Sequence, residues 1–476
     1  MTLEKPLVLD VDGTFLRTDM LLENLWAGLG VAPVQTIAAC LRHFRTPARL
    51  KAELAAIAPL RTDLLPVNAE VAELALQSRL AGREVVLASA SDRSLVARLA
   101  ADYGLSERYF ASDGVTNLKG AAKAGALVDA YGEGGFDYAG NAAVDMPIWE
   151  RAENALVVGH VPSARALSAS GHNVVELPGG WAARSLLKAM RPHQWVKNVL
   201  LLLPLLASHR FDLATLLPIL WGIAAFSLAA STIYVANDLL DLEADRLHPT
   251  KCRRPFASGA VPIGVGMAAM TGIGAAALLI AALLSPAFLL VTLLYMALSL
   301  AYSLKLKRMR WVDITMLATL YTIRVVAGAA AAAVGVSIYM LIFVFPIFLT
   351  LGCVKRITEL SRATGNERLP GRGYGRGDLG DLRNVAWIGV VGALVIFLLY
   401  SVSDQAVALY PTTWILWVAM IPMAAWMVRM VTLAWNGRQD YDPIVFALRD
   451  PLGLGLLMLT LSLMFWAARL WQQWFG

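Results

Sequence analysis

The sequence predicts two parts of different fold class: a Rossmann-like α/β domain with a small helical cap, then an all-α membrane domain of nine transmembrane helices. Over the first third of the chain, short apolar runs alternate with helical patterns, which is typical of a parallel sheet. The chain is 58% hydrophobic, and its mean hydropathy of +0.58 exceeds that of an average soluble protein. From about residue 197 onward, apolar stretches of roughly 17–25 residues recur, and each is long enough to cross a bilayer.

Polar side chains follow the predicted strands of the first part. The apolar run 7–9 ends at Asp10 and Asp12, which would project the same way because alternate residues of a strand share a face. The run 85–88 ends at Ser89. Since doubly wound sheets bind ligands at the carboxyl ends of their strands, these side chains predict one site.

Two further segments complete this pattern. Lys119 lies where a predicted helix opens, and the run 137–139 leads to Asn141, with Asp145 four residues later. Taken in order, these four short motifs resemble those of the haloacid dehalogenase-like phosphohydrolase superfamily, over about residues 1–165.

The resemblance implies that Asp10 is the nucleophile that forms an aspartyl-phosphate and that Asp12 is the general acid and base. It also implies that Ser89 hydrogen-bonds the phosphoryl group and that Lys119 neutralises its charge. One Mg²⁺ ion would be held by Asp10, the backbone carbonyl of Asp12, Asn141 and Asp145.

One position departs from the superfamily pattern, because many members have an aspartate where Asn141 stands. We therefore expect weaker metal binding, with Asp145 as the main acidic ligand. Ser91 and Lys123 fit a structural role and a phosphate-binding role equally well. The segment 20–75 has a helical pattern and would form the cap. A degenerate domain kept for stability or docking is the alternative, and the intact motif set argues against it.

Pro and Gly cluster over residues 160–180, which indicates a domain boundary. We predict a phosphohydrolase-like domain over 1–165, a linker with an interfacial helix over 166–184 and a membrane domain over 185–476. The mixture of apolar and basic residues near 181–190 suits a helix on the membrane surface and, equally, the basic flank of a first span. The nine predicted spans cover about 197–209, 213–236, 260–284, 286–304, 312–334, 337–354, 385–403, 411–435 and 452–472.

Composition excludes several other classes of protein. The three cysteines are too few and too scattered for a disulfide framework or a zinc site. No secretory signal is expected at the start, because two aspartates interrupt the only apolar run there. The net charge of +6 gathers in alternate loops, which indicates membrane topology rather than nucleic-acid binding. By the positive-inside rule, we expect a multi-pass protein of the inner (plasma) membrane, with the first domain and the basic active-site loops in the cytoplasm.

An acidic motif closes the second predicted span and consists of Asn237, Asp238, Asp241 and Asp245. Charged groups at membrane depth are expensive, so their default interpretation is functional. Three of the four share one helical face, and clustered oxygen ligands hold hard cations such as Mg²⁺, which commonly brings a diphosphate. Lys251 and Arg254 follow closely and would bind the remaining phosphate oxygens. A solvated helix cap is the structural alternative.

The acidic motif and the Arg254-Pro255 pair that follows resemble the UbiA prenyltransferase superfamily, over about residues 185–476. The aromatic prenyltransferases of that superfamily carry a second acidic motif between spans six and seven. Here the loop 355–383 is dominated by cations and has no aspartate pair four residues apart. Such a loop suits a phosphate bound directly by arginine and lysine.

Further cations at the mouth of the first span resemble the decaprenyl-phosphate phosphoribosyltransferase branch. That branch transfers ribose 5-phosphate from phosphoribosyl pyrophosphate to a polyprenyl phosphate. Arg324, near the middle of the fifth span, fits either the lipid phosphate or a structural pair. The residues that we assign to substrate binding in the membrane domain are Arg191, Lys197, Asn198, Lys251, Arg254, Lys305, Lys307, Arg324, Lys355, Arg356, Arg372 and Tyr374.

The two parts together predict a bifunctional enzyme. Phosphoribosyl transfer leaves a phosphate monoester on the lipid-linked sugar, and a tethered phosphatase would remove it to give polyprenyl-phosphoryl-ribose. Asp238 and Asp241 would be the catalytic acids of the transfer, with at least one Mg²⁺ ion. Two alternatives stay open: an aromatic or quinone-type prenyltransferase that uses a prenyl diphosphate, and a phosphoribosyltransferase whose first domain is regulatory. The expected partners are phosphoribosyl pyrophosphate, polyprenyl phosphate and the membrane, without nucleic acid, and a homo-oligomer is compatible with the sequence.

Overall fold

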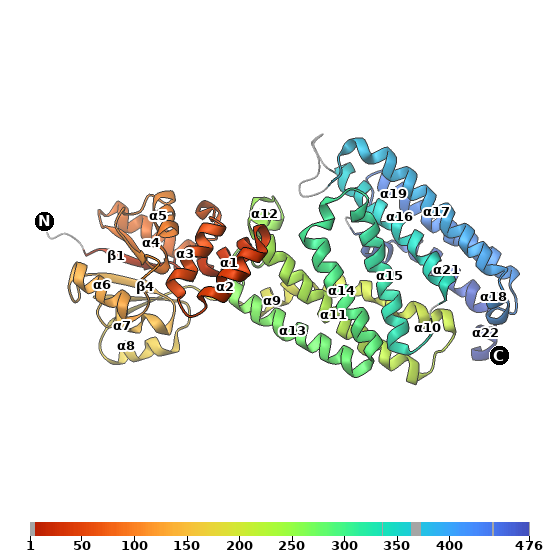
Figure 1. Ribbon diagram of the computed structural model, residues 1–476, viewed down its shortest axis with the longest axis horizontal. Helices are drawn as coiled ribbons and strands as arrows, with labels where there is room; N and C mark the ends of the chain where they lie inside the picture. The colour runs from red at the N-terminus through yellow and green to blue at the C-terminus, as the bar shows by residue number, and fades with distance from the viewer. Residues whose placement is uncertain (1–4, 336, 363–372, 440–441, 476) are drawn as a thin grey trace. The chain divides into compact units, whose positions relative to one another are not determined.

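The computed structural model describes residues 5–335, 337–362, 373–439 and 442–475. The chain forms two compact units (Figure 1). The first unit contains residues 1–190 together with 234–271, and the second contains 191–233 together with 272–476. The acidic motif therefore belongs to the first unit, with the N-terminal domain.

A six-stranded sheet forms the centre of the first unit, with the order β3-β2-β1-β4-β5-β6 and parallel pairing throughout. The strands are β1 (Leu7–Asp10), β2 (Val85–Asp92), β3 (Tyr109–Ser112), β4 (Asp137–Gly140), β5 (Asn154–Val158) and β6 (Asn173–Leu177). This order is that of a doubly wound sheet, with β1 between β2 and β4. The parallel α/β prediction is confirmed. Strand β6 follows the predicted boundary at residue 165 and pairs with β5 along its whole length, so the sheet extends beyond that residue.

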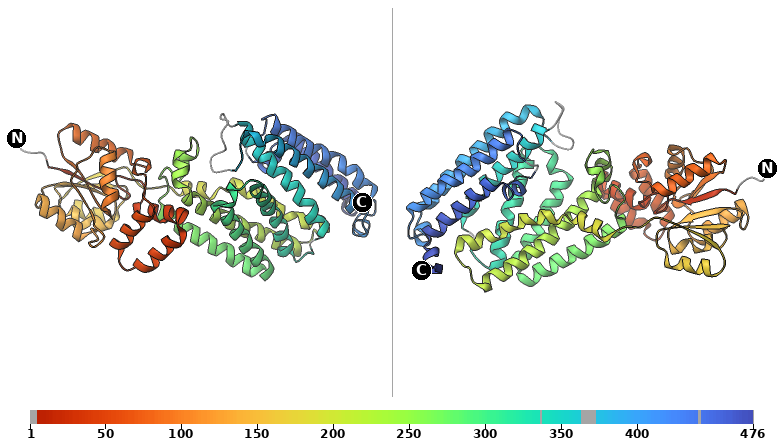
Figure 2. Two further views of the ribbon diagram at one scale, coloured as in Figure 1. Left: turned by 45° about the horizontal axis from the view of Figure 1, so that its top comes forward. Right: turned by 180° about the vertical axis from the view of Figure 1, so that it is seen from behind.

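Helices cover both faces of this sheet (Figure 2). Leu7 and Leu9 pack on one face with residues of α4 and α5, while Val8 packs on the other face with residues of α6 and α7. This alternation follows from the period of two along a strand. The helices of this layer are α4 (Ala69–Leu80), α5 (Arg93–Asp102), α6 (Ala121–Tyr131), α7 (Met146–Trp149) and α8 (Arg165–Ala169).

The predicted cap consists of three helices, α1 (Met20–Val31), α2 (Pro33–His43) and α3 (Pro47–Ile57). Asp19 accepts a hydrogen bond from the backbone N–H of Leu22 at 3.0 Å and so caps α1. Pro33 and Pro47 stand at the first positions of α2 and α3, where the missing N–H costs nothing.

The acidic-motif segment packs against this cap. It comprises the last turns of α11 (Leu213–Leu240), the short helix α12 (Leu242–Leu247), the loop that follows and the first turns of α13 (Ile263–Leu284). Trp26 of α1 is buried in a cluster with Val235, Leu239 and Phe256. The helix α9 (Ala183–Met190) joins the same cluster through Ala189.

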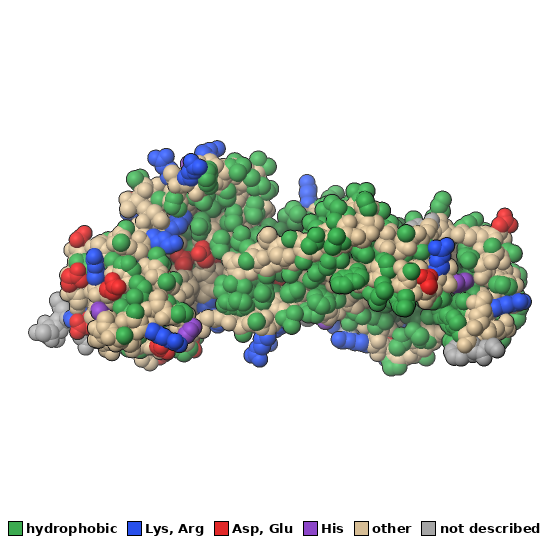
Figure 3. Space-filling model, turned by 90° about the horizontal axis from the view of Figure 1, so that it is seen from below, with side chains coloured by type: hydrophobic (Ala, Val, Ile, Leu, Met, Phe, Trp, Pro, Cys, Tyr) green, Lys and Arg blue, Asp and Glu red, His purple; other side chains and the backbone are tan. Residues whose placement is uncertain are grey.

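Within the described residues, seven helices are long and apolar enough to cross a membrane, so the chain is an integral membrane protein. They are α11, α13, α14 (Pro286–Leu304), α15 (Val312–Ala332), α16 (Ile338–Arg362), α17 (Leu379–Ser401, with the span counted from Arg376) and α19 (Trp414–Trp435). On the face that Figure 3 shows, hydrophobic side chains cover most of the surface of these helices.

The predicted count of nine spans is not confirmed. The first predicted span forms a 3₁₀ helix, Pro192–Leu202, followed by the six-residue α10 (Leu203–Ser208), which is too short to cross a bilayer. The last one forms α21 (Pro451–Ala467), with 17 residues. The shorter helices α18 (Asp404–Leu409), α20 (Pro443–Ala447) and α22 (Leu470–Phe475) complete the second unit.

Candidate active sites

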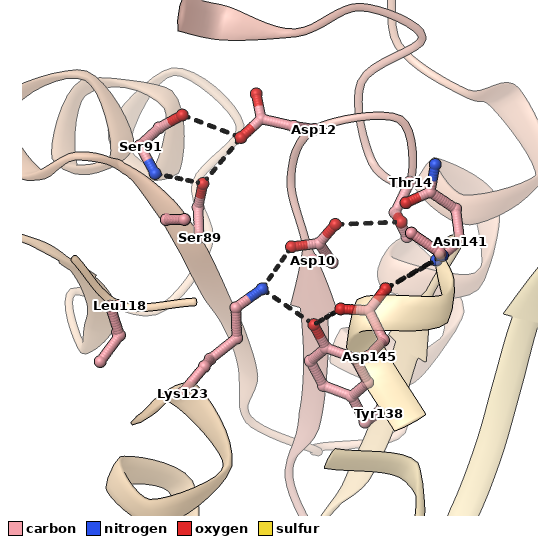
Figure 4. A network of polar contacts seen from close by, with 12 residues as sticks. Asp10, Asp12, Thr14, Ser89, Ser91, Leu118, Lys123, Tyr138, Asn141 and Asp145 are labelled. Carbon is pink, nitrogen blue, oxygen red and sulfur yellow. Dashed lines mark hydrogen bonds and ion pairs between the residues drawn. The ribbon is translucent and has the colours of Figure 1, made fainter. Parts of the chain in front are cut away.

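The first candidate site lies where β1 ends, and Asp10 is at its centre (Figure 4). The ammonium group of Lys123 donates a hydrogen bond of 2.6 Å to the Asp10 carboxylate and one of 3.0 Å to the Tyr138 hydroxyl. Tyr138 in turn donates to Asp145 at 3.2 Å. These side chains, together with Asp12, are called the Asp10 centre below. In this centre, one lysine contacts Asp10 at the end of β1 and Tyr138 of β4, and Tyr138 contacts Asp145 in the 3₁₀ turn after β4.

The lysine of this centre is Lys123, and the prediction of Lys119 is wrong as to position. Lys119 is exposed and precedes the helix, whereas Lys123 lies in the first turn of α6 and is only 4% exposed. Helix α6 begins at Ala121, so the residue that faces β1 comes one turn after the residue that we predicted.

Asp12 is held by three donors. Its carboxylate accepts hydrogen bonds from the backbone N–H of Met20 at 2.8 Å, from Ser89 at 2.9 Å and from Ser91 at 2.8 Å. Ser89, predicted to contact a phosphoryl group, is fully buried within β2 and here positions Asp12. Met20 opens α1, so the cap begins at the carboxylate that we predict to be the general acid.

Asp145 is 2% exposed and accepts hydrogen bonds from the backbone N–H groups of Asn141 and Ala142, at 3.2 and 3.1 Å. The Asn141 side chain lies over Gly13, where an added Cβ would come within 2.2 Å of its amide nitrogen. Gly13 also has a φ of +82°, so both its backbone and its neighbour require glycine.

Burial and like charge dominate the electrostatics of this site. Burial raises the pKa of Asp10 to about 7, and the nearby carboxylates of Asp145 and Asp12 add to the increase, against the opposing effect of Lys123. Burial disfavours the charged form of Lys123, yet the neighbouring Asp10 and Asp145 outweigh it, so the lysine pKa is raised. The centre therefore holds more acidic groups than one ammonium ion neutralises.

The second candidate site is the acidic motif. Arg254 bridges two of its members: one guanidinium nitrogen lies 3.0 Å from a carboxylate oxygen of Asp238 and 2.7 Å from one of Asp245. The side chains of both aspartates are at most 3% exposed. Burial raises the pKa of Asp245, and Arg254 opposes that rise. Asn237 and Asp241 are half-buried, while Lys251 is exposed.

The donor chemistry of both sites fits Mg²⁺, because all predicted side-chain ligands are carboxylate or amide oxygens. In the part of the chain that the structure describes, however, no three His, Cys, Asp or Glu side chains are gathered closely enough to hold a metal ion. At each site a cation of the chain itself, Lys123 or Arg254, stands between the acids. The metal assignments stay predictions.

A second contact of the acidic-motif segment was not predicted. Arg246 of α12 donates to the carboxylate of Glu23 in α1 at 2.5 and 3.1 Å, and Thr18 donates to the same carboxylate at 2.6 Å. The side chains of Glu23 and Arg246 are 2% and 7% exposed. In the sequence, the only sign of this contact was Glu23, an acidic residue within a predicted helix. Its partner, Arg246, lies 223 positions away, so the sequence did not connect the two.

The second unit contains the other predicted substrate-binding residues, and three of them form one cluster. Asn198 donates to Ser227 at 2.9 Å and accepts from Arg324 at 3.1 Å, and Arg324 also donates to Tyr295 at 3.1 Å. The neighbouring Lys197 forms an ion pair with Asp442. All of these predicted cations are buried.

Arg356 and Tyr374, both assigned to substrate binding, are buried and contact other parts of the chain. Arg356 is fully buried and pairs with Asp313 at 2.5 Å and with Glu359. The Tyr374 hydroxyl, also buried, accepts a hydrogen bond from the backbone of Trp311 at 2.7 Å. Arg356 therefore joins α16 to α15, and Tyr374 joins its loop to the start of α15. Lys305 is exposed, Arg191, Lys307 and Lys355 are half-buried, and Arg372 lies outside the described residues.

Comparisons with known proteins agree with the sequence patterns. Residues 199–449 match the family model described as the UbiA prenyltransferase family. An uncharacterized protein of Sinorhizobium fredii, y4nM, is 35% identical over 457 residues, 94% of this chain and 87% of that protein. A decaprenyl-phosphate phosphoribosyltransferase of Mycobacterium tuberculosis is 39% identical over 198 residues, 40% of this chain and 65% of the relative. A solved UbiA homolog from Archaeoglobus fulgidus bound to DMAPP and Mg²⁺ has a TM-score of 0.45 at 14% identity, over 60% of this chain and 99% of that one.

Proposed function

The chain belongs to the UbiA prenyltransferase family, and from that premise we propose that it is a bifunctional phosphoribosyltransferase and phosphatase. It transfers 5-phosphoribose from phosphoribosyl pyrophosphate to a polyprenyl phosphate and releases pyrophosphate. Its N-terminal domain then removes the 5-phosphate, which gives polyprenyl-phosphoryl-ribose. We place both sites on the cytoplasmic side of the plasma membrane, because the loops around them are basic.

The likeness to decaprenyl-phosphate phosphoribosyltransferase supports the choice of branch within the family. The alignment covers 65% of that relative, so its activity comes to this chain as a proposal. The coupling of the two reactions is supported by one observation, namely which segments of the chain make up the first unit. The acidic motif and the Asp10 centre lie in one compact unit, and both α1 and α12 contribute to it. An aromatic prenyltransferase leaves no phosphate monoester on its product and so has no use for this arrangement.

In the transfer step, an oxygen of the lipid phosphate forms a bond to the anomeric carbon as the bond from that carbon to pyrophosphate breaks. Oxygens of the acidic motif would hold Mg²⁺, which neutralises pyrophosphate oxygens when bound. Arg254 can bind phosphate oxygens from its place between Asp238 and Asp245, since a guanidinium suits bidentate anion recognition. We also propose Lys197 and Arg324 as ligands of an anionic substrate.

In the hydrolytic step, the Asp10 carboxylate attacks the phosphorus of the 5-phosphate, and the sugar hydroxyl leaves with a proton from Asp12. Water then attacks the aspartyl-phosphate with Asp12 as the base, which releases inorganic phosphate and restores both aspartates. Lys123 neutralises the charge that develops on the phosphoryl oxygens. Asp10, Asn141 and Asp145 would hold the Mg²⁺ ion of this site.

The experiment supplies phosphoribosyl pyrophosphate labelled in the ribose, together with a polyprenyl phosphate, to the purified full-length protein and identifies lipid products by mass. The wild type should give the dephosphorylated lipid-linked sugar. Asp10→Asn should accumulate its 5-phosphate at an unchanged rate of transfer, and Asp241→Asn should give neither lipid product.

Each alternative has its own signature in this assay. Label that never reaches the lipid, together with prenylation of an aromatic acceptor from a prenyl diphosphate, would contradict the transfer step. An Asp10→Asn variant that yields the same dephosphorylated lipid as the wild type would contradict the coupled scheme and leave a regulatory role for the first domain.

A further inference from the structure

Helix α2 of the cap has its apolar face on the outside. Val34, Ile37, Leu41 and Phe44 recur at spacings of three, four and three residues, which places them on one side of the helix and the residue after it. Their exposed fractions are 79, 52, 73 and 68%. The buried side carries the small residues Thr36 and Ala39. A helix of a soluble domain has the opposite arrangement, so this stripe requires a partner.

The charged residues around the stripe are mostly basic. Between Glu23 and Glu53 the chain has no acidic residue but four basic ones, Arg42, Arg45, Arg49 and Lys51. Arg42 and His43 contact Glu53 of α3, at 3.0 and 2.7 Å. Arg45 and Arg49 are exposed beside the stripe, and the guanidinium of Arg45 lies 5.0 Å from the centre of the Phe44 ring. An apolar face flanked by arginine suits the surface of a lipid bilayer, which has an apolar interior and anionic headgroups.

The position of the stripe within the first unit also points to a lipid surface as its partner. Helix α1 leads directly into α2 and packs by Trp26 and Leu22 against the last turns of α11 and the start of α13. A Cβ added at Gly30 would lie 3.7 Å from the backbone oxygen of Leu240, the last residue of α11. In both Figure 1 and Figure 2, the cap lies beside these helix ends. Since α11 and α13 are both long enough to cross a bilayer, their ends lie near its surface.

We propose that α2 is an interfacial helix that inserts Val34, Ile37, Leu41 and Phe44 into the leaflet at the ends of α11 and α13. Arg45 and Arg49 contact anionic lipid headgroups there. The partner is the lipid surface itself, to which residues of this kind bind at the boundary of headgroups and acyl chains. The contact orients the cap, and with it the mouth of the Asp10 centre, towards the membrane, where a lipid-linked substrate is available.

Quenching by modified lipids tests this proposal on the full-length protein. The three cysteines are replaced by serine, single cysteines are introduced at Ile37 or Leu41, and an environment-sensitive fluorophore is attached. The protein is reconstituted into nanodiscs with lipids brominated at different depths along the acyl chain. Labels at both positions should lose most of their emission, and the loss should be greatest with lipids brominated near the headgroup.

Two exposed apolar positions outside the cap serve as matched controls. Leu76 lies in α4 and Leu80 ends it, with exposed fractions of 48 and 79%. Labels there should keep their emission with every lipid. Equal emission from Ile37, Leu41 and these controls would overturn the proposal.

Lipid charge and self-association supply the remaining tests. Charge reversal by Arg45→Glu and Arg49→Glu should reduce quenching at Ile37 in nanodiscs that contain an anionic lipid, and it should have less effect in neutral ones. A bifunctional reagent that cross-links Leu41→Cys of two copies, with no quenching by lipids, would instead identify a second copy of the chain as the partner and refute lipid insertion.

Discussion

Removing the charge of Glu23 should release the acidic-motif segment from the cap. Glu23 and Arg246 form an ion pair that is almost inaccessible to water, and the pair joins α1 to α12. In Glu23→Gln the size of the side chain is kept and only its charge is lost. Arg246 then remains buried without its counter-charge, although its bond to the backbone oxygen of Ala257, at 3.1 Å, persists.

The size of the effect follows from the burial of both partners. Breaking a buried pair by removing one charge destabilises by about 3–5 kcal/mol, whereas an exposed pair contributes about 0–1 kcal/mol. The Thr18 bond to Glu23 and the packing of Trp26 remain, so we expect the lower part of that range. Since about 1.4 kcal/mol corresponds to a tenfold change, the segment should open on the order of a hundredfold more often.

Hydrogen exchange measured by mass spectrometry gives this opening directly. Amides of residues 242–260 and of α1 should exchange faster in Glu23→Gln, while those of α6 should be unchanged. The matched control is Glu53→Gln, whose pair with Arg42 has side chains 31% and 63% exposed and should matter little. The double variant Glu23→Leu with Arg246→Met should recover most of the protection, because no buried charge is left without a partner.

Unchanged exchange in Glu23→Gln would refute the reasoning, since it would mean that the pair contributes no net stability. Acceleration in all peptides, including α6, would show that the pair maintains the whole unit rather than this one contact. If Glu53→Gln had the same effect as Glu23→Gln, burial would not be the cause.

Three further predictions concern the two candidate sites. Lys123→Met should abolish phosphate release by the full-length protein, whereas Lys119→Met should keep most of it; a colorimetric phosphate assay on a soluble monoester compares the two. In metal-free buffer, the carboxylate form of Asp10 should be populated only as pH rises through about 7. The pKa of Asp10 in the folded state lies above that in the unfolded chain, so folding favours the protonated form. The stability of the folded state should therefore decline as pH rises from about 4 to about 7. Thermal unfolding of Asp10→Asn should not show that decline. Arg254→Lys keeps one charge but cannot bridge two carboxylates as a planar guanidinium does, so transfer of labelled ribose should fall by roughly tenfold or more.

The sequence predicted the fold correctly in those segments where apolar residues follow a clear pattern along the chain. Strands β1, β2 and β4 were predictable because apolar runs ended in polar residues, and the long spans were predictable from length and hydropathy. The segment 197–209 was predicted as a span, although the chain there forms the end of a 3₁₀ helix, Pro192–Leu202, and one short α-helix, Leu203–Ser208. Composition alone does not distinguish these from one continuous helix.

The errors at the sites have a different physical origin, because they depend on contacts between distant parts of the chain. A helix opening near Lys119 was expected, but which of Lys119 and Lys123 reaches β1 depends on where that helix starts. Arg356 was assigned to substrate because its partner Asp313, 43 positions away, belongs to another helix. A cation in a predicted loop looks the same in the sequence whether it faces a ligand or a buried carboxylate.

The two candidate sites solve the same electrostatic problem in the same way. Each gathers carboxylates that repel one another when buried, and each holds a cation of the chain among them, Lys123 beside Asp10 and Arg254 between Asp238 and Asp245. Without those cations the acids would take up protons or separate, and the arrangement that we propose for holding Mg²⁺ and a phosphate would be lost. With them, the acids stay close, and in the proposed reactions the cation would be available to bind a phosphate. A variant that lacks either cation should therefore lose the arrangement of the acids as well as the contact to substrate.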